Sequence, residues 1–402
     1  MRDDRAAFIV FAILYLTLMT WGIGKPWQLI HEDTGSIATG FARSHFKLGL
    51  ARTKGHDFRV DRESGQVMAY AHHPPGSNLL LAAAMWVSAR TDPVLVRLTA
   101  ILWHSVSVIL LCLLAAHYWG RQGAAWAALL LAVMPMSVFF GRYLEPHIFV
   151  LPAMIGFVLV YFSCLEVLSW RKVAVMAVMS AWAALMAWQV FFAMAACGGH
   201  AGMMYLVRRK PSYMAAAALI ALWAAVLFAA DVAHIYWAAG EDGLHRLSWG
   251  YGSATVTAAM HPWWQSAGHA FEFCRRYFTE VVLAAALWLF WRAGRAVLAG
   301  KGLGEDTQIL LVFFAAGVLN LIVFPNRSRN HHYWPYALLP FMTLAFVDTM
   351  RWVRQSWPAS YRRVSLCAVF LLVLSSSLTL YRRHTKIDGY AYREARAMER
   401  YH

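Results

Sequence analysis

Long apolar runs alternate with short basic segments along this sequence, and that alternation restricts the fold more than any other feature. Each run is close to the ~20 residues that an α-helix needs to cross a bilayer. Of the 402 residues, 60% are hydrophobic and only 14% are charged, whereas about a quarter of a soluble domain is charged. The sequence therefore predicts an all-α polytopic membrane protein.

About eleven spans are expected within one transmembrane domain that covers residues 1–402. The first run, 7–24, is too long for a signal-peptide core and lacks a small-residue cleavage site, so we interpret it as a retained span. A first polar loop, core spans, a second polar loop, C-terminal spans and a tail should follow at 25–94, 95–237, 238–278, 279–381 and 382–402. The individual spans are expected at 95–118, 123–141, 147–166, 172–187, 190–207, 213–237, 279–297, 308–325, 334–350 and 364–381. The pair 172–187 and 190–207 also fits a re-entrant hairpin interrupted at Trp188 and Gln189.

Basic residues predict the orientation, because short loops rich in Lys and Arg stay in the cytoplasm. Alternate short loops carry such residues: Arg2 and Arg5; Arg121; Arg171 and Lys172; Arg208, Arg209 and Lys210; Arg292, Arg295 and Lys301; and Arg351, Arg354, Arg362 and Arg363. Both long loops are then extracytoplasmic, in a bacterial inner membrane. The span count also puts the basic tail outside, against the positive-inside rule. The sequence therefore leaves open whether there is one more span. This clustering accounts for the net charge of +15 without nucleic acid as a partner.

The first polar loop should carry helices that lie along the membrane. Ile37, Phe41 and Leu48 recur at helical spacing while Arg43 and Lys47 point elsewhere, which is typical of an interfacial amphipathic helix. A second, apolar helix is expected at 76–89, because a proline suits its first turn.

Two acids, Glu32 and Asp33, stand directly after the first span. One of them can cap the helix that begins near Thr34. An acid at the outer surface can also serve as general base toward a hydroxyl, or as a ligand of a divalent cation. The stretch by itself leaves both readings open.

A short outer turn, 142–147, carries Arg142, Glu145 and His147. A surface pair between Arg142 and Glu145 would be of little consequence. Because this turn lies on the same side as Asp33, Glu145 is also a candidate second carboxylate of one site, with Arg142 and His147 as substrate contacts.

Two further outer segments are rich in cations and imidazoles. His72 and His73 precede a helix N-terminus, where they are either turn residues or ligand contacts, and Arg97 starts the next span. The loop at 326–334 departs from the positive-inside pattern and contains Arg327, Arg329, His331, His332 and Tyr333. Such side chains bind phosphate well; contact with anionic lipid headgroups is the alternative.

Carboxylates for an acceptor hydroxyl, cations for a phosphate and a membrane that delivers the phosphate on a lipid together describe glycosyl transfer from a lipid-linked donor. The sequence also resembles the GT-C membrane glycosyltransferases, in the protein-mannosyltransferase and aminoarabinose-transferase group. The resemblance is carried in order by HEDTGSIATGFARSHFKLGL, YAHHPPGSNLLLAAAMWVSARTDPVLVRLTAIL, GRYLEPHIFVLPAM and RNHHYWPYALLPF, over residues 1 to about 350.

The resemblance implies a GT-C fold and a polyprenyl-phosphate sugar as donor, with a hexose or pentose moved to a lipid, polysaccharide or protein. The first-loop base maps onto Asp33, with Glu32 adjacent, and the second acid onto Glu145. The order Glu-Asp departs from the commoner Asp-Glu order, which leaves open which carboxylate acts. The 327–333 segment looks like the donor phosphate site, joined by Arg97, and the family's HPP segment falls at His73, Pro74 and Pro75 as a substrate contact.

We expect an inverting displacement in which Asp33 accepts the acceptor proton and Arg327, Arg329, His331 and His332 stabilise the departing phosphate. No cofactor is required, and a divalent cation stays possible with unknown ligands. A polyprenyl-phosphate lipid or glycan transporter is the alternative, although no internal repeat typical of transporters is visible. A metal-dependent hydrolase is disfavoured because the sequence has no HExxH motif.

Overall fold

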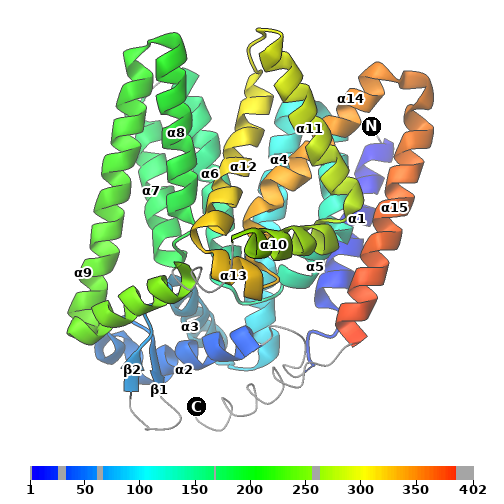
Figure 1. Cartoon of the computed structure of the whole chain (residues 1–402). Coiled ribbons are helices and arrows are strands. Elements are labelled where there is room, and N and C mark those ends of the chain that lie inside the picture. The colour runs from blue at the N-terminus through cyan, green and yellow to red at the C-terminus, as the bar shows by residue number, and fades with distance from the viewer. Residues whose placement is uncertain (1, 26–32, 61–66, 167–168, 256–262, 386–402) are drawn as a thin grey trace.

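A computed structural model describes residues 2–25, 33–60, 67–166, 169–255 and 263–385, which form helices and one small hairpin (Figure 1). The helices are α1 (Arg2–Thr20), α2 (Asp33–Thr53), α3 (Gly76–Ser88), α4 (Pro93–Val133), α5 (Pro135–Phe140), α6 (Pro146–Glu166), α7 (Trp170–Met186), α8 (Val190–Arg208), α9 (Pro211–Thr255), α10 (Trp263–Phe278), α11 (Glu280–Leu298), α12 (Glu305–Val323), α13 (Pro325–Asn330), α14 (Leu339–Ser356) and α15 (Pro358–Thr385). Strands β1 (Phe58–Val60) and β2 (Val67–Ala69) pair antiparallel, and a 3-10 turn covers Trp334–Leu338.

Among the described residues, seven helical stretches are long and apolar enough to cross a membrane, so the chain is an integral membrane protein. They are Pro93–Val133, Pro146–Leu165, Val190–Arg208, Pro211–Gly252, Glu280–Leu298, Glu305–Val323 and Pro358–Arg382. The total of eleven spans stays a prediction, because α1, α7 and α14 fall outside this set and the two spans expected within α4 form one stretch. In Figure 1, α7 and α8 extend beside α6 and α9 over a similar height, which favours two spans over a re-entrant hairpin.

Three helices contain a glycine whose backbone angles are essentially restricted to glycine. Gly120 (φ 70°, ψ −172°) breaks α4 at the loop that the sequence predicts between two spans. Gly240 (φ 61°, ψ −148°) breaks α9, and in Figure 1 the chain beyond it turns across the end of the bundle. We call residues 241–255 the α9 extension. The third break, at Gly49, shapes the end of α2.

Two predicted span boundaries are wrong. The span expected at 123–141 ends at Val133, because Met134 is extended before Pro135 and the chain restarts as the separate helix α5. The span expected at 334–350 begins with the 3-10 turn and becomes α-helical only at Leu339, as α14. Both differences occur at prolines, which remove a backbone donor.

The described parts of both long polar loops gather at one end of the bundle, the lower end in Figure 1, which we call the site end. There α2, α3, the hairpin, the α9 extension and α10 lie across the ends of the long helices. The predicted α2 and α3 are present, but Leu48 is 51% exposed while Ser36, Thr39 and His45 are buried. The buried face of α2 is therefore partly polar, and the amphipathic pattern did not identify it.

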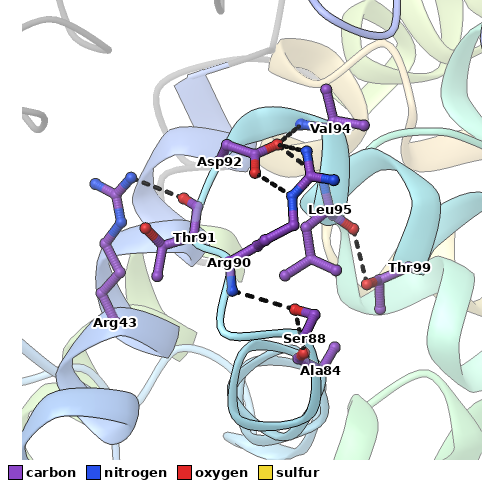
Figure 2. Close-up of polar contacts among 9 residues, drawn as sticks. All are labelled: Arg43, Ala84, Ser88, Arg90, Thr91, Asp92, Val94, Leu95 and Thr99. Carbon is purple, nitrogen blue, oxygen red and sulfur yellow. Dashed lines mark hydrogen bonds and ion pairs between the residues drawn. The ribbon is translucent and has the colours of Figure 1, made fainter.

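Polar contacts tie α2 to the following helices. Figure 2 shows Arg43 donating from α2 to the carbonyl oxygen of Thr91, in the turn between α3 and α4, over 2.8 Å. In the same turn Asp92 accepts from two backbone amides at the start of α4, at 2.9 and 3.3 Å, and from Arg90. The bond from Arg90 lowers the pKa of the Asp92 carboxyl. This capped turn gives the first loop a fixed exit into α4.

Candidate functional site

The acids after the first span are described only in part. Glu32 lies outside the described residues, and of Asp33 only the backbone position, at the start of α2, is described. Their side-chain contacts are therefore still predictions. The described chain ends at Lys25 before this segment and resumes at Asp33.

Two buried arginines hold the chain that leads toward these acids. Arg97, 1% exposed, donates from Nη1 to the carbonyl oxygens of Ile23 and Lys25, each at 2.6 Å. Arg142, 2% exposed, donates from Nη1 to the carbonyl oxygen of Trp21 at 2.6 Å. Hydrogen bonds from charged groups are the stronger ones. The described contacts orient the segment after α1, and the phosphate or substrate contact that the sequence suggested for each arginine stays a prediction.

The turn between α5 and α6 carries the second predicted acid into the protein interior. Glu145 is 6% exposed, and its amide donates to the carbonyl oxygen of Tyr143 at 2.9 Å. Because Arg142 and Glu145 are both buried, a solvent-exposed surface pair does not describe them. Its role as a second carboxylate of the site stays a prediction.

His147 extends this turn toward the next group of helices. Gln189, in the turn between α7 and α8, donates from its amide nitrogen to His147 Nε2 at 2.9 Å. The His147 ring also packs against Tyr333 and Trp334, with centroid distances of 5.6 and 4.7 Å. Three segments far apart in the sequence thus meet at His147.

A cavity of about 440 Å³ opens beside this meeting point. Its walls come from the segment before α3, the turn between α7 and α8, α9 and its extension, the end of α12, and α13. Most lining side chains are aromatic or aliphatic, and the polar ones include His72, His73, Gln189 and Arg327. Arg327 is the one formally charged residue among the described lining residues. The cavity therefore suits a ligand with a long apolar part and a compact anionic part.

His72 is fixed within the wall of this cavity. Its carbonyl oxygen accepts from Trp188 Nε1 at 2.9 Å, and its ring lies between Tyr70 and Trp249, with centroid distances of 4.9 and 5.6 Å. Gly250 of the α9 extension approaches the same ring closely. The α9 extension can therefore cover the cavity only because residue 250 has no side chain.

The polar end of the cavity is positive. Arg327 donates from Nη1 to His331 Nε2 at 3.1 Å, which leaves the His331 proton on Nδ1. Burial, and then the positive potential of His147, Arg327, His72 and His331, lowers the pKa of the His73 imidazole well below its usual range. A bound anion would reverse that potential and stabilise positive charge on these groups.

The predicted segment 327–333 divides between the cavity and its surroundings. Arg327 lines the cavity and His331 contacts Arg327, whereas Arg329 is not among the described lining residues. His332 faces α10 instead, where its Nδ1 lies 3.1 Å from the hydroxyl of Tyr277. Tyr333 is 6% exposed and packs on His147. The sequence therefore located the segment but not the separate contacts of its members.

Three buried polar atoms around the cavity have no hydrogen-bond partner in the described part of the chain. They are His73 Nδ1, His147 Nδ1 and Gln189 Oε1. Buried polar atoms are nearly always hydrogen-bonded in native proteins. A ligand with hydroxyl or phosphate oxygens would satisfy such atoms, which supports a binding role for this cavity.

Several cavity residues were not predicted as site residues. Trp188 and Gln189 were noticed only as an interruption between apolar runs, and Gly250 gave no signal. The polar interruption could have identified Gln189, because a polar side chain at a span end is costly unless it is used. The aromatic lining residues resemble any residue of an apolar helix and carry no such signal.

No protein-family model matches the sequence, and no curated protein is similar to it at a significant level. Solved structures are similar to it in three dimensions. An oligosaccharyltransferase from Archaeoglobus fulgidus, in complex with Zn and sulfate, superposes with a TM-score of 0.63 at 12% identity, over 93% of this chain and 53% of that one. ArnT from Cupriavidus metallidurans superposes with a TM-score of 0.63 at 12% identity in the apo state, over 97% of this chain and 76% of that one. With undecaprenyl phosphate bound, ArnT gives a TM-score of 0.61 at 11% identity, over 97% and 77%.

The chain has the GT-C fold. The resemblance predicted from the sequence is thereby confirmed at the level of the fold, which is what a likeness at 11–12% identity shows. This chain spans about half of the oligosaccharyltransferase and about three quarters of ArnT.

The GT-C fold here offers two possible metal ligands close together in the sequence, Glu145 and His147. Within the described residues, no group of three or more His, Cys, Asp or Glu side chains is arranged to hold a metal ion. A carboxylate is a suitable donor for a borderline cation, and His147 would bind one through a ring nitrogen released from its bond to Gln189. A complete ligand set would need a further donor from the segment at Glu32 and Asp33.

Proposed function

We propose that this protein is an integral-membrane glycosyltransferase that moves a sugar from a polyprenyl-phosphate-linked donor to an extracytoplasmic hydroxyl acceptor. The cavity is the observation that best supports this proposal. It has a volume of about 440 Å³ and mostly aromatic and aliphatic walls, and Arg327, His73 and His72 are among its polar lining residues. That composition matches an isoprenoid chain that ends in a phosphate. A guanidinium favours phosphate because its donors are arranged as a planar fork.

The structural neighbours support this choice of ligand. ArnT binds undecaprenyl phosphate, and the Archaeoglobus fulgidus oligosaccharyltransferase AglB binds dolichol-phosphate together with an inhibitory peptide. A phosphate on a long isoprenoid is therefore a ligand of this fold. We infer the same ligand class for this chain.

We place the site end on the extracytoplasmic face of a bacterial inner membrane. The positive-inside rule supports this placement, because the loops opposite the site end contain the basic clusters at 171–172 and 208–210. An eleven-span topology is consistent with it, and the basic residues 327 and 329 would then be retained outside for phosphate binding.

In the proposed reaction, Asp33 removes the proton of the acceptor hydroxyl as its oxygen attacks the anomeric carbon. The bond from that carbon to the phosphate oxygen breaks, and its electron pair leaves on the polyprenyl phosphate. Arg327, to which His331 is hydrogen-bonded, stabilises the developing charge, and the direct displacement inverts the anomeric carbon. Glu32 is the adjacent alternative base. Glu145 orients Asp33 or contacts the sugar.

A divalent cation also fits this proposal. Glu145 and His147 would hold it with help from Asp33, and the cation would neutralise phosphate charge as a Lewis acid. The AglB relative is known in complex with Zn and sulfate. Arg97 and Arg142 fix the backbone that leads toward the acids, and a phosphate contact for Arg97 and a substrate contact for Arg142 remain part of this proposal.

The proposal is tested with the purified full chain in nanodiscs and a panel of radiolabelled undecaprenyl-monophosphate sugars, scored for transfer to lipid, polysaccharide and peptide acceptors. Asp33→Asn should abolish transfer while undecaprenyl phosphate still binds. Asp242→Asn, an exposed acid on the α9 extension paired with Arg246, is the matched control and should keep wild-type transfer. Full activity of a folded Asp33→Asn variant would disprove the base assignment. Movement of the lipid across the bilayer without sugar transfer would favour the transporter.

A further inference from the structure

A buried polar cluster outside the cavity joins α2 to the rest of the first loop. His45 Nδ1 donates to Thr53 Oγ1 at 2.9 Å, and His45 Nε2 lies 2.9 Å from Asp57 Oδ1. Asp57 Oδ2 accepts from Asn78 Nδ2 of α3 at 2.6 Å. His45 and Asp57 are each 1% exposed. The cluster is therefore sealed from solvent, and none of its members lines the cavity.

The cluster depends on the break in α2. Residues 45 and 53 would lie about 12 Å apart along a straight helix. Gly49, with φ 77° and ψ 163°, bends the chain so that Thr53 reaches His45, and Thr53 Oγ1 donates back to the carbonyl oxygen of Gly49 at 3.1 Å. Since that hydroxyl proton is used on Gly49, Thr53 accepts the proton of His45 Nδ1.

Asp57 also organises the hairpin through its backbone. The amide of Tyr70 donates to the carbonyl oxygen of Asp57 at 2.8 Å and closes the β1–β2 hairpin. The Tyr70 ring then packs on Phe41 of α2, at a centroid distance of 4.7 Å, and on His72 at 4.9 Å. A single residue thus links α2, α3 and the histidines in the cavity wall.

Both carboxyl oxygens of Asp57 are hydrogen-bonded, Oδ1 to His45 and Oδ2 to Asn78. One proton is shared between His45 Nε2 and Asp57 Oδ1, so the pair carries no net charge in either arrangement. Burial raises the pKa of the Asp57 carboxyl, and the bonds from His45 and Asn78 oppose that rise. Removing one partner would leave a buried polar atom without a bond, which is more disruptive than replacing both.

We propose that His45, Asp57 and Asn78 are positioning residues that hold α2 and the His72–His73 segment in their places beside the reaction site. This inference rests on the proposed function, because α2 begins at Asp33. The cluster acts through α2 on the proposed base, whereas Arg327, the charged ligand of the donor phosphate, is carried by α13. Loss of the cluster therefore slows turnover more than it weakens donor binding.

The test compares Asp57→Ala with Asp57→Asn in full-length protein in nanodiscs. Asparagine keeps every bond, since it can donate to His45 Nε2 and accept from Asn78. Asp57→Ala should lower turnover of an undecaprenyl-monophosphate sugar about 10- to 100-fold, the effect of a displacement of about 1 Å. Binding of undecaprenyl phosphate, followed by tryptophan fluorescence, should change far less. Asp57→Asn should restore most of the turnover.

Two further variants keep the test decisive. Asn78→Ala removes one bond only and should give a smaller loss in the same direction if Asp57→Ala does not fold. Arg90→Ala, which breaks an exposed pair in the same loop, is the control and should leave both readouts unchanged. Hydrogen exchange of the amides at 33–53 should rise in Asp57→Ala and Asn78→Ala but not in Asp57→Asn.

Three results would overturn the positioning role: wild-type turnover in Asp57→Ala, equal losses of turnover and donor binding, or equal impairment of Asp57→Asn and Asp57→Ala. Failure of the proposed function looks different, because wild-type protein would then transfer no sugar at all. The exchange measurement would still show whether the cluster holds α2.

Discussion

Gly250 provides a sharp test of how the α9 extension covers the cavity. A Cβ atom at this position would lie 2.5 Å from His72 Cδ2 and 3.0 Å from His72 Nε2. Carbon atoms in contact prefer about 3.5 Å or more, so the helix or the ring must move by roughly 1 Å. His72 cannot swing aside freely, because Tyr70 and Trp249 flank its ring.

Overpacking of this kind costs about 1–3 kcal/mol. If that cost falls on closing the cavity around its ligand, Gly250→Ala weakens undecaprenyl phosphate binding by about 5- to 150-fold at most. Gly252 lies about half a helical turn further along the same segment, and a Cβ atom there would meet nothing within 4 Å. Gly252→Ala is therefore the matched control.

The measurement is a titration of undecaprenyl phosphate into nanodisc-embedded protein, followed by tryptophan fluorescence, since Trp188 and Trp334 line the cavity. Gly250→Ala should bind more weakly and Gly252→Ala should bind as wild type does. The reasoning is refuted if the two variants bind equally, or if Gly250→Ala keeps wild-type affinity while circular dichroism shows both to be folded.

Two further predictions concern charge. Arg327→Ala should weaken undecaprenyl phosphate binding by about 1.5–3 kcal/mol, the usual value of a hydrogen bond to a charged group. Arg329→Ala should weaken it less, because Arg327 is among the described lining residues and Arg329 is not. Equal losses in the same titration would contradict this. Burial, His234 and His45 lower the pKa of His56 to about 4. An unfolded chain takes up this proton near pH 6.5, so folded-state stability should be unaffected above that pH and fall between pH 6.5 and 4. Thermal unfolding of His56→Phe should show a smaller loss over this range, and an unchanged pH profile would rule out His56 as its source.

The sequence determined the parts of this fold that depend on local hydrophobicity and on backbone restrictions. Apolar length predicted the long helices, and the helix after HHPP begins within a residue of its expected start because proline suits a first turn. The break at Gly120 falls in the predicted loop. By contrast, the span expected at 123–141 was cut short at Pro135, where local chemistry outweighs hydrophobicity.

The candidate site was predictable as a set of segments and not as a set of contacts. Acids and cations at the outer ends of spans are costly and therefore conspicuous in sequence, which located 72–73, 145 and 327 correctly at the site end. Arg97 and Arg142 look the same in sequence as Arg327, yet their described bonds go to backbone carbonyls. Only packing distinguishes an arginine that holds the chain from one that faces a cavity.

The sequence by itself thus determined that this is a membrane protein with a GT-C resemblance and an outer end rich in acids, arginines and histidines. The tertiary structure decided which of these groups meet. His147 reaches Gln189, and His45 reaches Asp57 and Asn78, across chain separations that no local pattern records. Hydrophobic periodicity is a property of neighbouring residues, whereas a binding site and the cluster that positions it depend on contacts between segments joined only by folding.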